Sequence, residues 1–129
     1  MGYNIADLFE SVVDTVPDKT ALVSGDTRLT FREFDARINQ FAHALAARGV
    51  GPGDNIGLQV YNGTEFLIAM LGAFKLRAVP ININYRYVDE ELTYLYKNAD
   101  LVALVFQHEL ADRVTAAVPA APGLKTLIV

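Results

Sequence analysis

The segment Tyr85-Arg86-Tyr87 carries the side chains in this sequence that are best suited to binding a charged ligand. An arginine guanidinium donates two parallel hydrogen bonds to a phosphate, and it also stacks on an aromatic base. The segment follows residues 79–82, which are typical of a strand, and α/β sheets bind ligands beyond the carboxyl ends of their strands. Arg86 is therefore a candidate phosphate-binding residue. The same residue types also suit a structural role, in which the arginine holds a loop through hydrogen bonds to backbone carbonyls.

Patterns for other chemistry are missing from the sequence. It contains no Ser-His-Asp arrangement, no GxSxG elbow and no GxxxxGK[ST] phosphate loop. His43 and His108 both lie in helical contexts without a nearby nucleophile, which indicates surface or structural roles. The acidic run Asp89-Glu90-Glu91 lies where a helix should begin, and the helix dipole favours negative charge there. We therefore expect no catalytic and no metal-binding residue in this chain.

The run Gly49-Val50-Gly51-Pro52-Gly53 is glycine-rich but is wrongly placed for phosphate binding. A dinucleotide-binding loop follows a strand and opens a helix, so that the helix amides face the pyrophosphate. This run instead follows a predicted helix and leads into a predicted strand. It therefore indicates a left-handed helix stop and a turn.

Composition excludes several classes of partner and location. The chain has 129 residues, 52% of them hydrophobic, and a net charge of -4, which offers no electrostatic footprint for nucleic acid. It has no cysteine, and its longest apolar run, 66–74, is too short for a transmembrane segment. The N-terminal residues MGYNIADLFE lack the features of a secretory signal. We expect a cytoplasmic location.

Apolar spacing and capping residues divide the N-terminal part into a helix, a hairpin and a second helix. Asn4 is a capping residue, and the apolar residues after it follow helical spacing. Residues 21–24 and 28–30 are typical of a small β-hairpin. Thr30 and Glu33 form a capping box, and the helix that follows should turn inward Phe34, Ile38, Phe41 and Leu45.

The remaining chain alternates short apolar strands with helices. Strands are expected at 55–60, 79–82, 101–106 and 126–129, and helices from Phe66 to about Arg77, at 89–98 and at 108–118. Asn62-Gly63-Thr64-Glu65 offers a cap to the first of these helices. The alternation predicts an α/β fold with a mostly parallel sheet flanked by helices and a small N-terminal β-hairpin. We expect residues 1–129 to form one partial domain, truncated at its C-terminal edge.

Three sequence blocks, in this order and spacing, carry a family resemblance. They are Leu29-Thr30-Phe31-Arg32-Glu33-Phe34, then Asp54 through Asn62 to Glu65-Phe66, and then Gly72-Ala73-Phe74-Lys75-Leu76 onward through Asn84, Arg86 and Glu91-Leu92. With them, nearly the whole chain resembles the N-terminal part of acyl-CoA synthetases, which belong to the AMP-binding, adenylate-forming enzymes. The form Asn84-Tyr85-Arg86-Tyr87 is most similar to bacterial fatty-acid or steroid-acid CoA ligases. One departure is Arg77, where the family usually has glycine, so we expect a different helix exit there.

The resemblance implies the chemistry of a longer protein. Such ligases use ATP and Mg²⁺ to convert a carboxylic acid into an acyl-adenylate, and then transfer the acyl group to CoA. The resemblance also implies that Arg86 faces a phosphate of CoA. The family's glycine-rich ATP loop, magnesium-binding glutamate, ribose-binding aspartate and C-terminal lysine match nothing in this chain. We therefore expect the 129 residues alone to be inactive and to bind none of these cofactors tightly.

A different class of function stays open. The chain could be a free-standing α/β binding or protein-interaction module that derives from a truncated ligase. Surfaces that the rest of a ligase would cover would then be exposed, and a homodimer could form through them.

Overall fold

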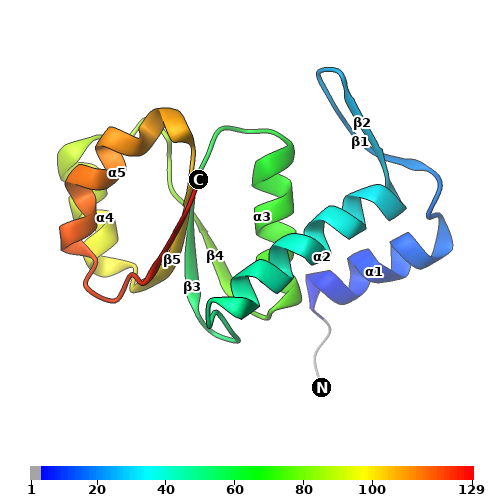
Figure 1. Cartoon of the computed structure of the whole chain (residues 1–129), viewed down its shortest axis with the longest axis horizontal. Coiled ribbons are helices and arrows are strands. Elements are labelled where there is room, and N and C mark those ends of the chain that lie inside the picture. The colour runs from blue at the N-terminus through cyan, green and yellow to red at the C-terminus, as the bar shows by residue number, and fades with distance from the viewer. Residues whose placement is uncertain (1–3) are drawn as a thin grey trace.

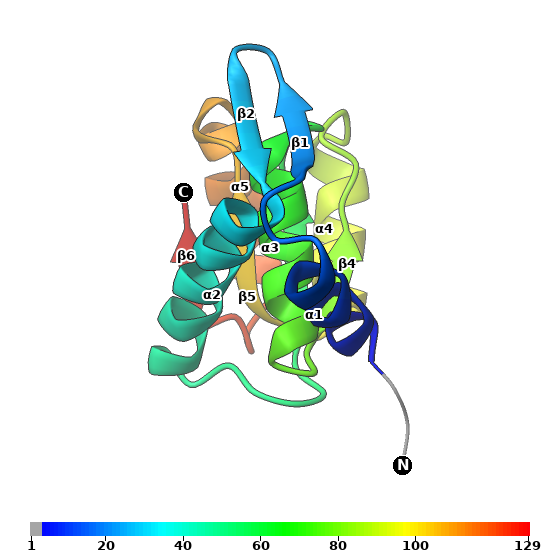
Figure 2. The same ribbon diagram turned by 90° about the vertical axis from the view of Figure 1, so that its right-hand side faces the viewer.

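The computed structural model describes residues 4–129, and the first three residues of the N-terminal segment MGYNIADLFE lie outside the described part. The N-terminal part contains the expected helix, hairpin and helix. Their bounds are α1 (Ile5–Thr15), β1 (Thr20–Ser24), β2 (Thr27–Thr30) and α2 (Phe31–Ala47). Figures 1 and 2 show the antiparallel hairpin β1–β2 projecting from the amino end of α2.

Both N-terminal helices begin with a capping box. The Asn4 side chain accepts a hydrogen bond from the N–H of Ala6, while the Asp7 carboxylate accepts one from the N–H of Asn4. Thr30 and Glu33 cap α2 in the same reciprocal way, as the sequence predicts. The pKa of the Glu33 carboxyl is held below its usual range mainly by its hydrogen bond with the backbone N–H of Thr30 and, to a smaller extent, by its hydrogen bond with the Thr30 side chain.

The second part of the chain forms the alternating α/β unit. Its elements are β3 (Asn55–Gln59), α3 (Thr64–Lys75), β4 (Val79–Asn82), α4 (Asp89–Asn98), β5 (Leu101–Phe106), the 3₁₀ turn η1 (His108–Leu110), α5 (Ala111–Ala117), the 3₁₀ turn η2 (Val118–Ala120) and β6 (Thr126–Ile128). The strands form one parallel sheet in the order β4-β3-β5-β6. The expected fold class is therefore confirmed.

Helices cover both faces of the sheet. Figure 1 shows the sheet nearly edge-on, with α4 and α5 on one side and α2 and α3 on the other. Even-numbered side chains of β3, such as Ile56 and Leu58, are buried toward α2 and α3. On the opposite face, Leu92 and Tyr96 of α4 pack with Leu104 of β5. Alternate residues of β3 thus face two separate cores, which explains why every residue of the strand after Asn55 is buried.

Edge strand β4 contains a proline. The N–H of Val79 bonds to the carbonyl of Asp54 and the N–H of Ile83 to that of Leu58, so the odd-numbered residues of this segment face β3. Pro80 lies between them, and its nitrogen faces away from β3. The missing N–H of Pro80 therefore removes no bond from the sheet.

Several boundaries differ from those that the sequence predicts. Helix α3 begins at Thr64, ends at Lys75, and has Gly63 as an N-cap without a side-chain hydrogen bond. The expected cap is wrong because glycine has no side chain to offer and the Thr64 side chain is buried. Residues 108–118 form a short helix between two 3₁₀ turns rather than one helix, since no side chain caps its start and Pro119 lacks an N–H at its end.

The inward face of α2 also differs in one position. Phe34, Ile38 and Leu45 are buried as expected, but Phe41 is only half-buried, and Ala42 occupies the buried position instead. Helix α3 passes close to this point. A Cβ atom on Gly72 would lie 2.8 Å from the Phe41 ring, so glycine is what allows the two helices to approach.

Lys75 joins the three helices on this side of the sheet. Its ammonium lies 2.5 Å from the Asp35 carboxylate and 2.6 Å from the Asn39 side-chain oxygen, both on α2. It also lies 3.3 Å from the carboxylate of Glu10 on α1. The Lys75 side chain is only 9% exposed, so this lysine is a nearly buried charge that three oxygen atoms surround.

Arg77 adopts the left-handed backbone conformation, with a φ of 60°. Glycine adopts this conformation without strain. Arg77 therefore ends the helix with the same left-handed turn that a glycine would make, but with backbone strain, and the expectation of a different helix exit is wrong. The Arg77 guanidinium donates to the Asp7 carboxylate at 2.8 Å. Helix α1 is therefore tied to the end of α3.

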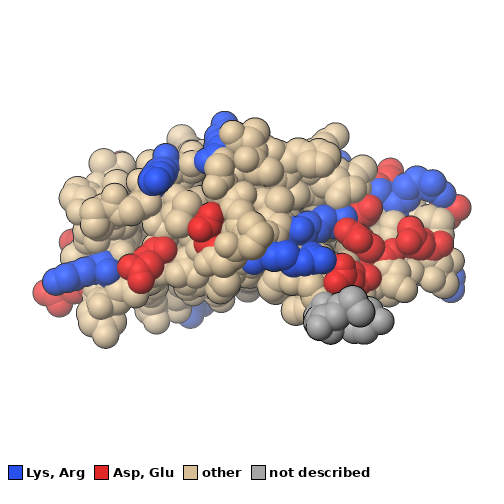
Figure 3. Space-filling model, turned by 90° about the horizontal axis from the view of Figure 1, so that it is seen from below, with Lys and Arg blue, Asp and Glu red and all other residues tan. Residues whose placement is uncertain are grey.

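The surface carries charges of both signs. Figure 3 views the end of the molecule where the parallel strands begin, and it shows basic and acidic side chains side by side around the amino-terminal helices. Among residues 4–129, no helix is both long enough and apolar enough to cross a bilayer.

We predict that Lys75→Met lowers the free energy of unfolding by about 3 kcal/mol, because it leaves the partly buried Asp35 carboxylate without its cation. Urea denaturation of the chain measures the loss. Arg32→Met is the matched control, since the pair between Arg32 and Asp18 is exposed and should contribute less than about 1 kcal/mol. Equal effects of the two substitutions would contradict the role of Lys75.

We predict that Arg77→Gly is more stable than Arg77→Ala by about 1 kcal/mol, because only alanine keeps a Cβ in the left-handed conformation. Both variants lose the ion pair with Asp7, so that loss cancels in the comparison. Thermal or urea denaturation measures the difference. An alanine variant at least as stable as the glycine variant would refute backbone strain at this position.

Candidate functional site

The loops after β3, β4 and β5 meet at one end of the sheet. The chain runs from β3 through α3 to β4 on one side and from β5 through α5 to β6 on the other, so the connections diverge between β3 and β5. Parallel sheets bind ligands at such a point, beyond the carboxyl ends of the strands. The glycine-rich turn lies at the opposite end of β3, with left-handed Gly49 and Gly53, as the sequence predicts.

Gln107 connects the ends of β3 and β5. Its backbone N–H donates to the carbonyl of Gln59 at 3.0 Å. Its side-chain oxygen accepts a hydrogen bond from the N–H of Tyr61 at 3.3 Å. The first residues of both loops are therefore held in register with each other.

A polar recess of about 290 Å³ lies beyond β3 and β4, and its polar lining residues are Asn62, Asn82, Asn84, Tyr85 and Arg86. The ring of Tyr85 packs edge-on against the ring of Tyr61, with 5.0 Å between the ring centres. The guanidinium of Arg86 lies 5.6 Å from the centre of the Tyr85 ring. Arg86 is exposed, and none of the ion pairs among residues 4–129 involves it. The recess thus offers an unpaired cation beside neutral amides, which suits an anion such as a phosphate.

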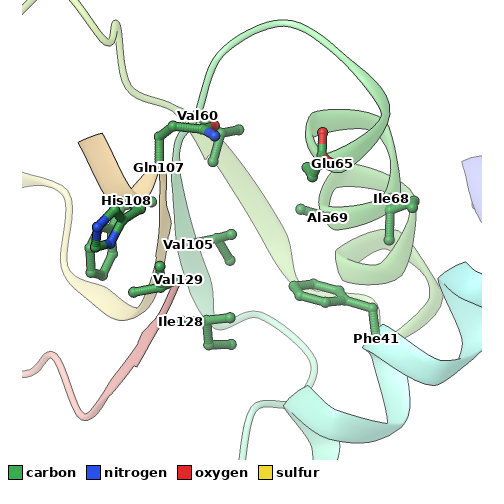
Figure 4. A pocket seen from close by; sticks show the side chains of 11 residues that line it. Phe41, Val60, Glu65, Ile68, Ala69, Val105, Gln107, His108, Ile128 and Val129 are labelled. Atoms are coloured by element: carbon green, nitrogen blue, oxygen red, sulfur yellow. The ribbon is translucent and has the colours of Figure 1, made fainter. Parts of the chain in front are cut away.

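A second, apolar hollow of about 340 Å³ lies between α3 and the ends of β5 and β6. Figure 4 shows Phe41 of α2 and Ile68 of α3 on one side of it and Val105 and Ile128 on the other. His108 lies at its margin. His43, by contrast, is exposed on α2. Neither histidine belongs to the polar recess.

Gln59 and Tyr96 form a buried polar pair beneath the loops. The Tyr96 hydroxyl donates to the side-chain oxygen of Gln59, and both residues are almost fully buried. Burial raises the pKa of Tyr96, because a phenolate would lose its hydration there. The amide nitrogen of Gln59 is buried without a hydrogen-bond partner. The pair was not predicted from the sequence, although a glutamine within a buried strand is a signal for a buried hydrogen bond.

Acidic side chains do not gather into a metal site in the part of the chain that the structure describes. Asp89, Glu90 and Glu91 lie in the first turn of α4, and the Glu91 carboxylate accepts a hydrogen bond from the N–H of Val88 at 3.3 Å. The capping interpretation of this acidic run is therefore confirmed. Nothing in this run fits a magnesium ion.

We predict that Tyr96→Phe lowers the free energy of unfolding by about 1–3 kcal/mol, because the Gln59 side chain then has no hydrogen-bond partner at either end. Adding Gln59→Leu should recover most of this loss, since the double variant leaves no buried polar group unpaired. Urea denaturation of the single and double variants tests the pair. Additive losses in the double variant would contradict it.

Comparisons with known proteins agree on one family. The family model described as AMP-binding enzyme matches residues 9–129. A medium/long-chain-fatty-acid–CoA/3-oxocholest-4-en-26-oate–CoA ligase of Mycobacterium marinum is 48% identical over 129 residues, which are 100% of this chain and 24% of that protein. A 3-oxocholest-4-en-26-oate–CoA ligase of Rhodococcus rhodochrous is 43% identical over 100% of the chain and 23% of its own length. The chain thus spans about a quarter of these relatives.

Solved structures show the same fold. The anthranilate CoA ligase AuaEII in complex with anthranoyl-AMP matches with a TM-score of 0.91 and 26% identity, over 98% of this chain and 25% of that one. The N-terminal domain of FACL13 from Mycobacterium tuberculosis matches with a TM-score of 0.91 and 26% identity, over 98% of this chain and 34% of that one. The chain belongs to the AMP-binding enzyme family, and its whole length is homologous to the N-terminal quarter of fatty-acid and steroid-acid CoA ligases.

Proposed function

We propose that this chain is the N-terminal segment of an ATP-dependent acid–CoA ligase. The whole protein would activate a carboxylic acid of the fatty or steroid type to an acyl-adenylate and transfer the acyl group to CoA. The observation that carries the proposal is the 48% identity to the Mycobacterium marinum ligase along all 129 residues. That relative is named for medium- and long-chain fatty acids and 3-oxocholest-4-en-26-oate, and this supports the choice of acid.

The described residues do not fit ATP and Mg²⁺. Adenylation needs cations and amides that hold a triphosphate and stabilise the charge that develops during the reaction. Residues 4–129 contain no cluster of side chains for a metal ion. The turn with Gly49 and Gly53 leads into β3, at the end of that strand remote from the recess. We infer that ATP and Mg²⁺ are bound by other parts of the full-length enzyme and that this chain alone does not adenylate an acid.

The recess beyond β3 and β4 does fit part of CoA. CoA carries phosphate groups on its nucleotide end, and Arg86 is an exposed guanidinium without a carboxylate partner in the described part of the chain. Asn62 and Asn84 line the same recess and offer neutral hydrogen-bond donors. We propose that Arg86 contacts a phosphate of CoA and so helps to orient the thiol end toward the acyl-adenylate.

We further propose that residues 1–129 are part of one larger α/β domain. Apolar side chains exposed at the surface suit either a larger domain or the alternative, a free-standing interaction module. Ile5, Leu8 and Val12 are exposed along one face of α1, and Leu127 and Val129 are exposed at the end of the chain. In a free-standing module these surfaces would bind a second copy of the chain, so a specific homodimer in sedimentation experiments would support that alternative.

We predict that an antibody against this chain detects a native protein several times heavier than 14.1 kDa in the source cells. The full-length protein should release pyrophosphate from ATP only when a fatty or steroid acid is added. The 129-residue chain should release none under the same conditions. A native band at 14.1 kDa would contradict the proposal that the chain is a segment of a longer ligase. Pyrophosphate release by the 129-residue chain would contradict the inference that the chain alone is inactive.

A further inference from the structure

The loop that carries Arg86 is held by a residue from a different element. The Arg113 guanidinium, on α5, donates a hydrogen bond to the backbone carbonyl of Tyr85 at 2.8 Å. The two residues are separated by 28 positions in the sequence, and the contact is partly buried. Helix α5 therefore anchors the loop after β4, although these two elements are not consecutive in the chain.

The contact acts on the peptide group that leads directly into Arg86. The carbonyl of Tyr85 and the N–H of Arg86 belong to one planar peptide unit, so fixing both groups fixes the orientation of the plane. Arg113 holds the carbonyl, and the side-chain oxygen of Asn84 accepts a hydrogen bond from the Arg86 N–H at 2.9 Å. The direction in which the Arg86 side chain leaves the backbone is thereby defined from both ends of the peptide.

The ring of Tyr85 is fixed at the same time. It packs edge-on against Tyr61, whose backbone N–H is bound by the Gln107 side chain. The Arg86 guanidinium lies over this ring, at 5.6 Å from its centre. An arginine whose backbone and guanidinium are held by such contacts loses less conformational entropy on binding an anion than an arginine on a flexible loop.

We propose that Arg113 is a positioning residue for Arg86 and that it preorganises the recess for the phosphate groups of a nucleotide. The inference rests on the proposed contact between Arg86 and a CoA phosphate, and it adds the residue that makes this contact effective. Arg113 acts through the Tyr85 carbonyl and does not itself bind the phosphate.

The test is a titration of the ¹⁵N-labelled chain with adenosine 3′,5′-bisphosphate, which has the phosphate pattern of the nucleotide end of CoA. Loss of one charged hydrogen bond should weaken the affinity of Arg113→Met about tenfold, with the largest shift changes at the Tyr85 and Arg86 amides. Arg113→Lys should recover part of the affinity, because its ammonium can donate to the same carbonyl. Arg48→Met is the matched control, because Arg48 also donates to a backbone carbonyl, that of Ala44, at the end of α2. Its affinity should equal that of the wild type.

A double-mutant cycle separates positioning from direct binding. In an Arg86→Met background, Arg113→Met should have no further effect on the affinity, because there is no guanidinium left to position. An undiminished effect in that background would show that Arg113 binds the phosphate itself and would overturn the positioning role. Equal affinities of wild type and Arg113→Met would overturn it as well.

The same titration also shows whether a negative result refutes the phosphate contact of Arg86 or only the role of Arg113. If Arg86→Met binds as well as the wild type, or if the wild type does not bind, the proposed phosphate contact of Arg86 fails and the inference fails with it. If Arg86→Met weakens binding while Arg113→Met does not, only the role of Arg113 is refuted. Amide spectra with the dispersion of the wild type confirm that each variant is folded.

Discussion

Strand β3 has hydrogen-bonded neighbours on both sides and helices over both faces, and most other features follow from this constraint. A buried strand must satisfy all its backbone groups within the sheet, so β4 and β5 have to lie beside it in parallel register. Parallel register in turn brings the loops after these strands to the same end of the molecule. Sheet geometry thus brings Gln107, Tyr61 and Tyr85 to one place, where the hydrogen bond of Gln107 and the contact between the two tyrosine rings then hold the loops.

The shared sequence blocks are explained mainly by architecture. Thr30 and Glu33 in the first block satisfy the first amides of α2. Asp54 at the start of the second block accepts a hydrogen bond from the N–H of Gly51 and closes the turn before β3. In the third block, Gly72 permits contact between two helices and Lys75 joins three. These parts of the family signature therefore reflect how the domain is built, whereas Arg86 in the third block takes part in none of the ion pairs among residues 4–129.

The sequence predicts local features well and contacts between distant segments poorly. The bounds of β4, α4 and β5 agree with the structure because apolar strands and an acidic helix start are signals that lie within the elements themselves. The predicted start of α3 is wrong because its N-cap residue, Gly63, has no side chain to form a capping hydrogen bond, so the sequence contains no capping motif at the true start of the helix. Arg86 was identified from its position after a strand. Arg113 was not, because α4 and β5 separate it from Tyr85 in the sequence and the contact forms only once these elements have folded.

The two edges of the parallel sheet differ in their capacity to accept a new strand. On β4, the outward positions include Pro80, which has no hydrogen to donate, so a strand docking there would face a gap in its ladder. Edge strand β6 contains no proline. Addition of a strand from another molecule is therefore less favourable at the β4 edge than at the β6 edge, because a strand beside β4 would lack the hydrogen bond at Pro80.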